Sequence, residues 1–221
     1  MAGPGEQAGF VSGETASMTS TPGAAGFAPC RWMQFVDGKS FTFHSQKLLK
    51  ISNYEPRESS FYKKDCFLWP GRDKVGFPRP GQAEAWPVRS FYYTSVEGGD
   101  DVRADAREKI RNLGFEPHVF SHEKHFGSTS AADIALTRDM LSHAFRGNYE
   151  IAVLVSGGGE YVPLIEEVKS LGKRVHVHFL GRHANAELKL VADAFEDLTP
   201  MILRWGFKSE NSAAFSAFES R

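Results

Sequence analysis

The feature of this sequence that most restricts the fold is an unbroken apolar run, IAVLV, at residues 151–155. A strand exposed on one side alternates apolar and polar residues, whereas an unbroken run is typical of a strand buried on both faces. The glycines Gly157 to Gly159 follow this run, and a segment of helical character begins at Glu160. A buried strand followed closely by a helix predicts a parallel sheet covered by helices.

Strand-like and helix-like segments alternate along most of the chain. The predicted strands are residues 33–38, 88–96, 115–122, 149–157 and 173–180. The predicted helices are residues 40–51, 100–114, 130–147, 160–172 and 184–195. This order predicts an α/β fold, a three-layer α/β/α sandwich with a mostly parallel sheet of about five strands.

The two ends of the chain and one internal segment depart from this alternation. Residues 1–30 are rich in Gly, Ala, Ser, Thr and Pro, and we expect them to be disordered. Residues 31–205 are expected to form one domain, followed by a C-terminal tail at 206–221. Within the domain, Pro and Gly interrupt residues 53–87, which predicts an inserted loop.

Aromatic rings and positive charges alternate in that inserted loop. Lys63 and Lys64 lie among Phe61, Tyr62, Phe67 and Trp69. Rings that stack on bases, next to charges that neutralise phosphates, suit single-stranded RNA. The alternative interpretation is that the rings pack on the domain as a small core.

Composition limits the classes of partner. The 26 basic and 27 acidic side chains give a formal net charge of −1, so any nucleic-acid binding must rest on a local patch. Cys30 and Cys66 lie far apart and match no zinc spacing, so free thiols in a reducing compartment are expected. No apolar stretch has the length of a membrane span. We therefore expect a cytoplasmic protein without a membrane partner.

Carboxylates follow several of the predicted strands. Asp37 ends the first strand, Asp133 opens the helix after the third, and Glu160 follows the fourth. In an open parallel sheet the ligand crevice lies at the carboxyl ends of the strands. Acids that converge there favour a hard divalent cation, Mg²⁺ or Mn²⁺, which can activate water and neutralise charge on a phosphodiester. This arrangement predicts nuclease chemistry.

Each of these acids also has a purely structural interpretation. Asp37 precedes Gly38 as in a turn, Ser130 and Asp133 fit a capping box, and Glu160 lies at a helix N-terminus. A helical wheel nevertheless places Asp133 inside an apolar arc that is predicted to be buried and consists of Ile134, Leu136, Met140, Leu141, Ala144 and Phe145. Asp139 falls on the opposite side of the wheel, where it is either solvated or reaches a neighbouring group.

The glycine turn allows a rival interpretation, a phosphate cradle. SGGGEY is not G-x-G-x-x-G, and no P-loop lysine follows it. The backbone amides of Gly158 and Gly159 could still meet one phosphate at the start of the helix. Arg182, just after the last predicted strand, could also meet phosphate or be an ordinary surface residue.

The segments FVDGKSF, FYYTSV and ADIALTRDM, together with the run through VSGGGEYV to HVHF, resemble the NYN domain in its LabA-like branch of the PIN-like nucleases. The resemblance covers residues 33–198. It implies a Mg²⁺-dependent endoribonuclease acting on RNA. The catalytic residues that it implies are Asp37, Asp133, Asp139 and Glu160. The metal ligands among them are Asp37, Asp133 and Glu160, with Asp139 assisting. The substrate contacts expected with them are Ser40, Ser156, Gly157, Gly158, Arg182, Lys63 and Lys64.

The chain departs from the family pattern at three positions. In the family turn S-G-D-x-D-F, Gly158 stands in place of the first Asp. Ser40 replaces the Asn of D-G-x-N, and Ser130 replaces a Lys that many relatives have. Two hypotheses therefore stay open: a ribonuclease that cuts single-stranded RNA, or a catalytically degraded module that binds RNA or a protein partner. A nucleotide-binding regulator is a third, and a homodimer is one expected assembly.

Overall fold

The computed structural model describes residues 30–52, 54–56, 60–63, 67–70, 87–121, 130–203 and 207–209. The predicted disordered segment at residues 1–30 lies outside these ranges except for its last residue, Cys30. Lys64 lies outside them as well, and Lys63 is described only by its backbone.

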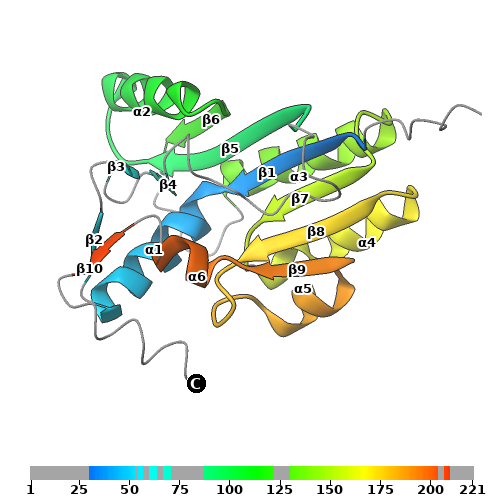
Figure 1. The fold of residues 1–221 in the computed structure, drawn as a ribbon. Coiled ribbons are helices and arrows are strands. Elements are labelled where there is room, and N and C mark those ends of the chain that lie inside the picture. Colours follow the sequence, from blue (N-terminus) through cyan, green and yellow to red (C-terminus); the bar gives the residue numbers. More distant parts are fainter. Residues whose placement is uncertain are drawn as a thin grey trace, which may run out of the picture.

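One parallel sheet forms the centre of the molecule (Figure 1). Among the described residues it has six strands in the order β6-β5-β1-β7-β8-β9, and every neighbouring pair is parallel. From one edge to the other the strands are β6 (Glu116–Ser121), β5 (Arg89–Val96), β1 (Trp32–Asp37), β7 (Ile151–Val155), β8 (Arg174–Phe179) and β9 (Ala194–Asp197). The predicted α/β fold with a parallel sheet is confirmed.

Helices cover both faces of the sheet (Figure 1). On one face lie α1 (Gly38–Ser52), α2 (Asp100–Asn112) and the short α6 (Thr199–Met201). On the other lie α3 (Ala131–Phe145), α4 (Val162–Ser170) and α5 (Ala186–Val191). Each face has its own buried cluster, and β7 is buried along its whole length, as its unbroken apolar run predicts.

The buried face of α3 differs from the predicted arc. Ile134 and Phe145 are 58% and 80% exposed, so the expectation that they are buried is wrong. The buried residues are instead Ala132, Ala135, Leu136, Met140 and Ala144. These five residues recur at spacings of one, three and four along α3 and so lie on one side of it, from which Ile134 and Phe145 are turned away.

The sixth strand replaces the end of a predicted helix. The helix expected at residues 184–195 ends at Val191, because Ala192 adopts an extended conformation with φ −68° and ψ 149°. The Asp193 backbone N–H then donates to the Val175 carbonyl at 2.9 Å, and the Asp193 carboxylate accepts from the Val175 N–H at 2.7 Å. These two bonds attach the chain to β8 and start β9.

Short strands also occur where a loop and a tail were predicted. β2 (Tyr54–Pro56) pairs antiparallel with β10 (Phe207–Ser209), and β3 (Ser60–Lys63) pairs antiparallel with β4 (Phe67–Pro70). Trp69 is only 4% exposed, and its ring packs against those of Phe41 and Phe115. Trp69 therefore belongs to the core, which agrees with the alternative interpretation that rings of the inserted loop pack on the domain.

Candidate carboxylate site

Asp37 links the end of β1 to the start of α1. Its Oδ1 accepts a hydrogen bond from the Ser40 backbone N–H at 3.0 Å, which is the bond of a helix N-cap. Its Oδ2 accepts from the Ser156 hydroxyl at 2.9 Å, across the neighbouring strand β7. The side chain is 5% exposed. Asp37 is thus held on two sides and turned towards the start of α4.

The Asp37 carboxyl interacts with the other two predicted acids. Burial raises its pKa to about 6, and the charges of Asp133 and Glu160 act in the same direction. The hydrogen bonds from Ser40 and Ser156 oppose this rise. Among the described residues, none of these three carboxylates forms an ion pair with Lys or Arg. Their mutual repulsion is therefore not neutralised by a cation of this part of the chain.

Asp133 caps α3 and also accepts a hydrogen bond from Tyr161. Its backbone N–H donates to the Ser130 hydroxyl and its Oδ2 accepts from the Ser130 N–H, both at 3.2 Å, so the capping box is present. Its other oxygen, Oδ1, accepts from the Tyr161 hydroxyl at 3.3 Å. Capping thus uses one carboxylate oxygen and leaves the other facing the site.

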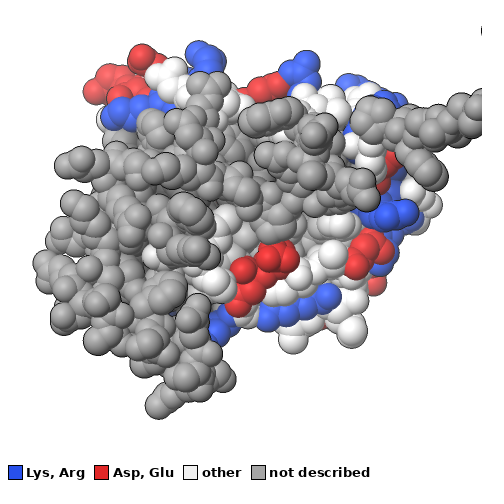
Figure 2. Space-filling model, viewed as in Figure 1, with Lys and Arg blue, Asp and Glu red and all other residues white. Residues whose placement is uncertain are grey.

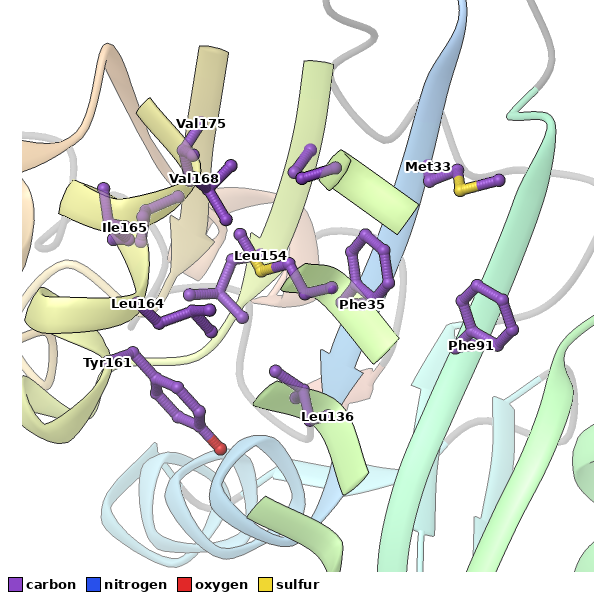
Figure 3. Close-up of a cluster of buried hydrophobic side chains, with 14 of the residues drawn as sticks. Met33, Phe35, Phe91, Leu136, Leu154, Tyr161, Leu164, Ile165, Val168 and Val175 are labelled. Carbon is purple, nitrogen blue, oxygen red and sulfur yellow. The ribbon is translucent and has the colours of Figure 1, made fainter. Parts of the chain in front are cut away.

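Tyr161 is the residue that the sequence interpretation missed. Its hydroxyl lies 3.3 Å from Asp133 Oδ1 and 3.5 Å from Asp37 Oδ2, and its single proton serves one of them at a time. Burial, then the nearby Asp37, raises the pKa of this phenol, which keeps it protonated as a donor. Figure 3 shows its ring at the edge of the apolar cluster, with the hydroxyl directed away from the aliphatic side chains. The available signal was that Tyr161 stands where S-G-D-x-D-F ends in Phe.

The glycine turn is built for close packing. None of its glycines has a positive φ. A Cβ on Gly157 would meet the Phe179 ring and the His183 carbonyl oxygen, and one on Gly159 would meet the Asn185 side chain at 2.7 Å. The Gly158 N–H donates to the Ser156 hydroxyl at 3.3 Å, so this amide is already used inside the protein.

The Glu160 carboxylate folds back over Gly158. A Cβ added to Gly158 would meet all three atoms of that carboxylate. Glu160 therefore occupies the space into which an aspartate at position 158 would project. An acid is present at this place although the residue at 158 carries none.

Asp139 has its contacts in a different group. The Tyr93 hydroxyl donates to its Oδ2 at 3.0 Å, and Arg138 forms an ion pair with its Oδ1 at 2.7 Å. His118 Nδ1 lies 3.9 Å from Oδ2. Asp139 thus reaches neighbours around the helix edge, and no hydrogen bond joins it to the described Asp37, Asp133 or Glu160.

The residues predicted to contact substrate differ in how far they are exposed. Ser156 is fully buried, and its hydroxyl supports Asp37. Ser40 is half-buried, and Arg182 is exposed in the connection between β8 and α5. The side chains of Lys63 and Lys64 lie outside the described residues.

The donor set suits a hard cation, although it does not form a closed metal site. Carboxylate oxygens are the ligands that Mg²⁺ and Mn²⁺ prefer. Within the described ranges, however, no group of three or more His, Cys, Asp and Glu side chains is arranged to hold a metal ion. The Tyr161 hydroxyl lies between two of the acids, and Glu160 is turned onto Gly158.

Among the helices of the described residues, none combines the length and the apolar character of a membrane span.

Comparison with known proteins identifies the domain. No curated protein matches the chain. A crystal structure of a protein of unknown function from Vibrio parahaemolyticus shares the fold, with a TM-score of 0.52 and 16% sequence identity over 76% of this chain and 93% of that one. The NYN domain family matches residues 59–199, which include Asp133, Asp139 and Glu160 and begin after Asp37. Since this match covers more than half of the 221 residues, the chain belongs to the NYN domain family, within the PIN-like nuclease superfamily.

Proposed function

We propose that this NYN domain is a Mg²⁺- or Mn²⁺-dependent endoribonuclease of the LabA-like branch that hydrolyses phosphodiesters of single-stranded RNA. The observation that carries the proposal is the environment of Asp37. A buried carboxylate whose pKa is raised to about 6, with Asp133 and Glu160 contributing, is a poor arrangement for stability alone. A divalent cation is the partner that would relieve it.

Asp37, Asp133 and Glu160 would hold the cation. When bound, such an ion supplies the positive charge that stabilises a phosphodiester under attack and makes water a better nucleophile. The protein's own contribution is orientation: Ser40 and Ser156 fix both oxygens of Asp37, and Ser130 fixes one oxygen of Asp133. Asp139 acts, in this proposal, from outside the group through α3.

Tyr161 keeps two of the acids together in the absence of a cation. Its hydroxyl is within hydrogen-bond reach of both Asp37 and Asp133, and its raised pKa keeps the proton on it. A protonated phenol between two carboxylates lowers the repulsion between them. We expect it to donate to one carboxylate while the cation takes the other.

The second candidate is a catalytically degraded NYN module that binds RNA or a protein. It is favoured by Gly158, where the family turn has an acid. The position of Glu160 favours the nuclease, because its carboxylate fills the space next to Gly158. The two candidates differ in whether RNA is cut.

A cleavage assay tests the proposal. A labelled single-stranded oligoribonucleotide is incubated with the full chain in Mg²⁺, in Mn²⁺ and in EDTA. We expect cleavage that needs the metal, that is lost in Asp37→Asn, and that survives in Glu108→Gln, an exposed control on α2. Cleavage that continues in EDTA or in Asp37→Asn contradicts the nuclease, and binding without cleavage supports the degraded module. Cytoplasmic location and a homodimer are parts of the proposal that microscopy and light scattering would test.

A further inference from the structure

The exposed side of α1 carries a row of basic and aromatic side chains that begins near Asp37. Lys39, Phe43 and Lys47 are all exposed, and Phe43 is 61% exposed. Residues four apart lie on the same side of a helix with about 6 Å between their Cβ atoms. The row therefore leads away from the carboxylate site. Phe43 does not contribute to the core, because most of its side chain is exposed.

Two histidine rings lie beside this row. The His44 ring centroid is 5.2 Å from that of Phe43, with the rings nearly perpendicular, and 4.8 Å from that of His183. His44 also contacts Phe179 at 5.5 Å, and Phe179 is the ring against which Gly157 packs. The aromatic group is thus continuous with the glycine turn.

Positive charge surrounds the two histidines. Burial lowers the pKa of His183, and the charges of Lys47 and Arg182 lower it further. Burial also lowers the pKa of His44, followed by His183 and Lys47. At neutral pH both imidazoles are therefore uncharged and offer ring faces, while the lysines and Arg182 provide the charge.

On the face shown in Figure 2, the Lys and Arg side chains that are described are interspersed with Asp and Glu. The formal net charge of −1 likewise gives no general attraction to nucleic acid. Binding of a polyanion by this chain needs a local set of cations, and α1 provides one.

We propose that the α1 surface, formed by Lys39, Phe43, His44, Lys47, Arg182 and His183, binds the single-stranded RNA that leads into the carboxylate site. Unpaired bases stack on the rings, and Lys39 and Lys47, two helical turns apart, neutralise separate phosphates of the strand. The inference rests on the proposed function for its choice of RNA. The occupant is RNA because its charge is opposite to that of the lysines and because the surface adjoins the proposed site.

The test measures binding without cleavage. The dissociation constant of a fluorescent oligouridylate is measured by anisotropy in EDTA, at several salt concentrations, for the full chain and four variants. Phe43→Ala is compared with Phe145→Ala, an 80% exposed phenylalanine at the C-terminal end of α3. Lys47→Gln is compared with Lys109→Gln, an exposed lysine in the last turn of α2.

We expect Phe43→Ala to weaken binding by about 5- to 150-fold, the range for loss of one stacked base. Lys47→Gln should reduce the slope of log K against log salt by about 0.7, the value for one phosphate contact of a single strand. Both controls should bind like the wild type. Circular dichroism and melting temperature establish that the variants are folded.

The outcomes separate this inference from the proposed function. Unchanged affinity in both Phe43→Ala and Lys47→Gln, or no binding by the wild type, overturns the α1 surface even if the protein cuts RNA. Weakened binding in both variants supports it even if the wild type never cuts RNA. If Phe43→Ala leaves RNA affinity unchanged and instead converts a dimer into monomers, a second copy is the occupant and the RNA assignment is wrong.

Discussion

The carboxylate of Glu160 lies in the space that a side chain at Gly158 would occupy. The two positions are therefore coupled: a side chain at position 158 would require the exposed Glu160 carboxylate to move, and this chain supplies the acid next to Gly158 from position 160. The sequence lacks the family aspartate at position 158, whereas in the structure the Glu160 carboxylate lies next to Gly158.

This coupling predicts how acids at the two positions can be exchanged. Glu160→Ala should lower both Mn²⁺ affinity and RNA cleavage by at least about 10- to 100-fold, the cost of losing even an outer-shell partner of a metal ligand. Adding Gly158→Asp to Glu160→Ala should restore most of this loss, because an acid returns to the same space. Gly158→Asp alone should destabilise the metal-free protein, since two carboxylates then compete. Titration calorimetry and the cleavage assay measure these effects, and a double variant no better than Glu160→Ala would count against the coupling.

Tyr161→Phe should reveal whether the phenol substitutes for a cation. Without metal, loss of a buried hydrogen bond to a charged group should cost about 1.5–3 kcal/mol of unfolding free energy. With saturating Mn²⁺ the cost should shrink, because the ion then neutralises Asp37 and Asp133. Urea unfolding in EDTA and in Mn²⁺ measures this difference.

Tyr149→Phe is the matched control for that experiment. Tyr149 is also buried, and its hydroxyl donates to the Met140 carbonyl at 2.8 Å. Loss of the Tyr149 hydroxyl should lower the unfolding free energy by the same amount with and without Mn²⁺. If Tyr161→Phe behaves in this way too, its hydroxyl has only a structural function.

The raised pKa of Asp37 predicts how stability depends on pH in EDTA. Between its usual value of 3.8 and the folded value of about 6, the unfolded chain has lost the proton and the folded chain keeps it. The contribution of Asp37 to stability therefore falls as the pH rises through this interval. Asp37→Asn removes the effect and keeps an N-cap side chain for α1, because Asn caps as well as Asp does.

The unfolding free energy of Asp37→Asn, relative to wild type, should thus increase by up to about 3 kcal/mol between pH 4 and pH 8. Urea titrations at the two pH values measure this change. A constant difference would mean that the Asp37 carboxyl titrates as an ordinary exposed acid.

The sequence predicts the sheet well because its strongest signals are local. The unbroken run in β7 and the glycines that follow α2, α3 and α4 mark those elements from the chain alone. β9 was missed because it depends on a contact distant in sequence, the pairing of Asp193 with Val175. The burial of Trp69 among Phe41 and Phe115 depends on tertiary packing in the same way.

Only part of the candidate site could be predicted from the sequence, because its side-chain contacts also join residues that are distant in the chain. The rule that ligands bind at the carboxyl ends of parallel strands places Asp37 and Glu160 at the same edge of the sheet, since β1 and β7 are neighbours. The rule gives strand ends and no side-chain directions, so the separation of Asp133 from Asp139 came instead from the helical wheel, and the structure gives the two acids different partners. Nor could spacing show that a phenol, Tyr161, lies between two carboxylates.

Calorimetric titration of Mn²⁺ into the metal-free protein tests the central claim most directly. We expect the wild type to bind Mn²⁺, Asp37→Asn and Asp133→Asn to lose most of that binding, and Asp139→Asn to change it less, because Asp139 contacts Tyr93 and Arg138 instead. Wild-type protein that takes up no Mn²⁺, or that binds it equally well after Asp37→Asn, would contradict the account.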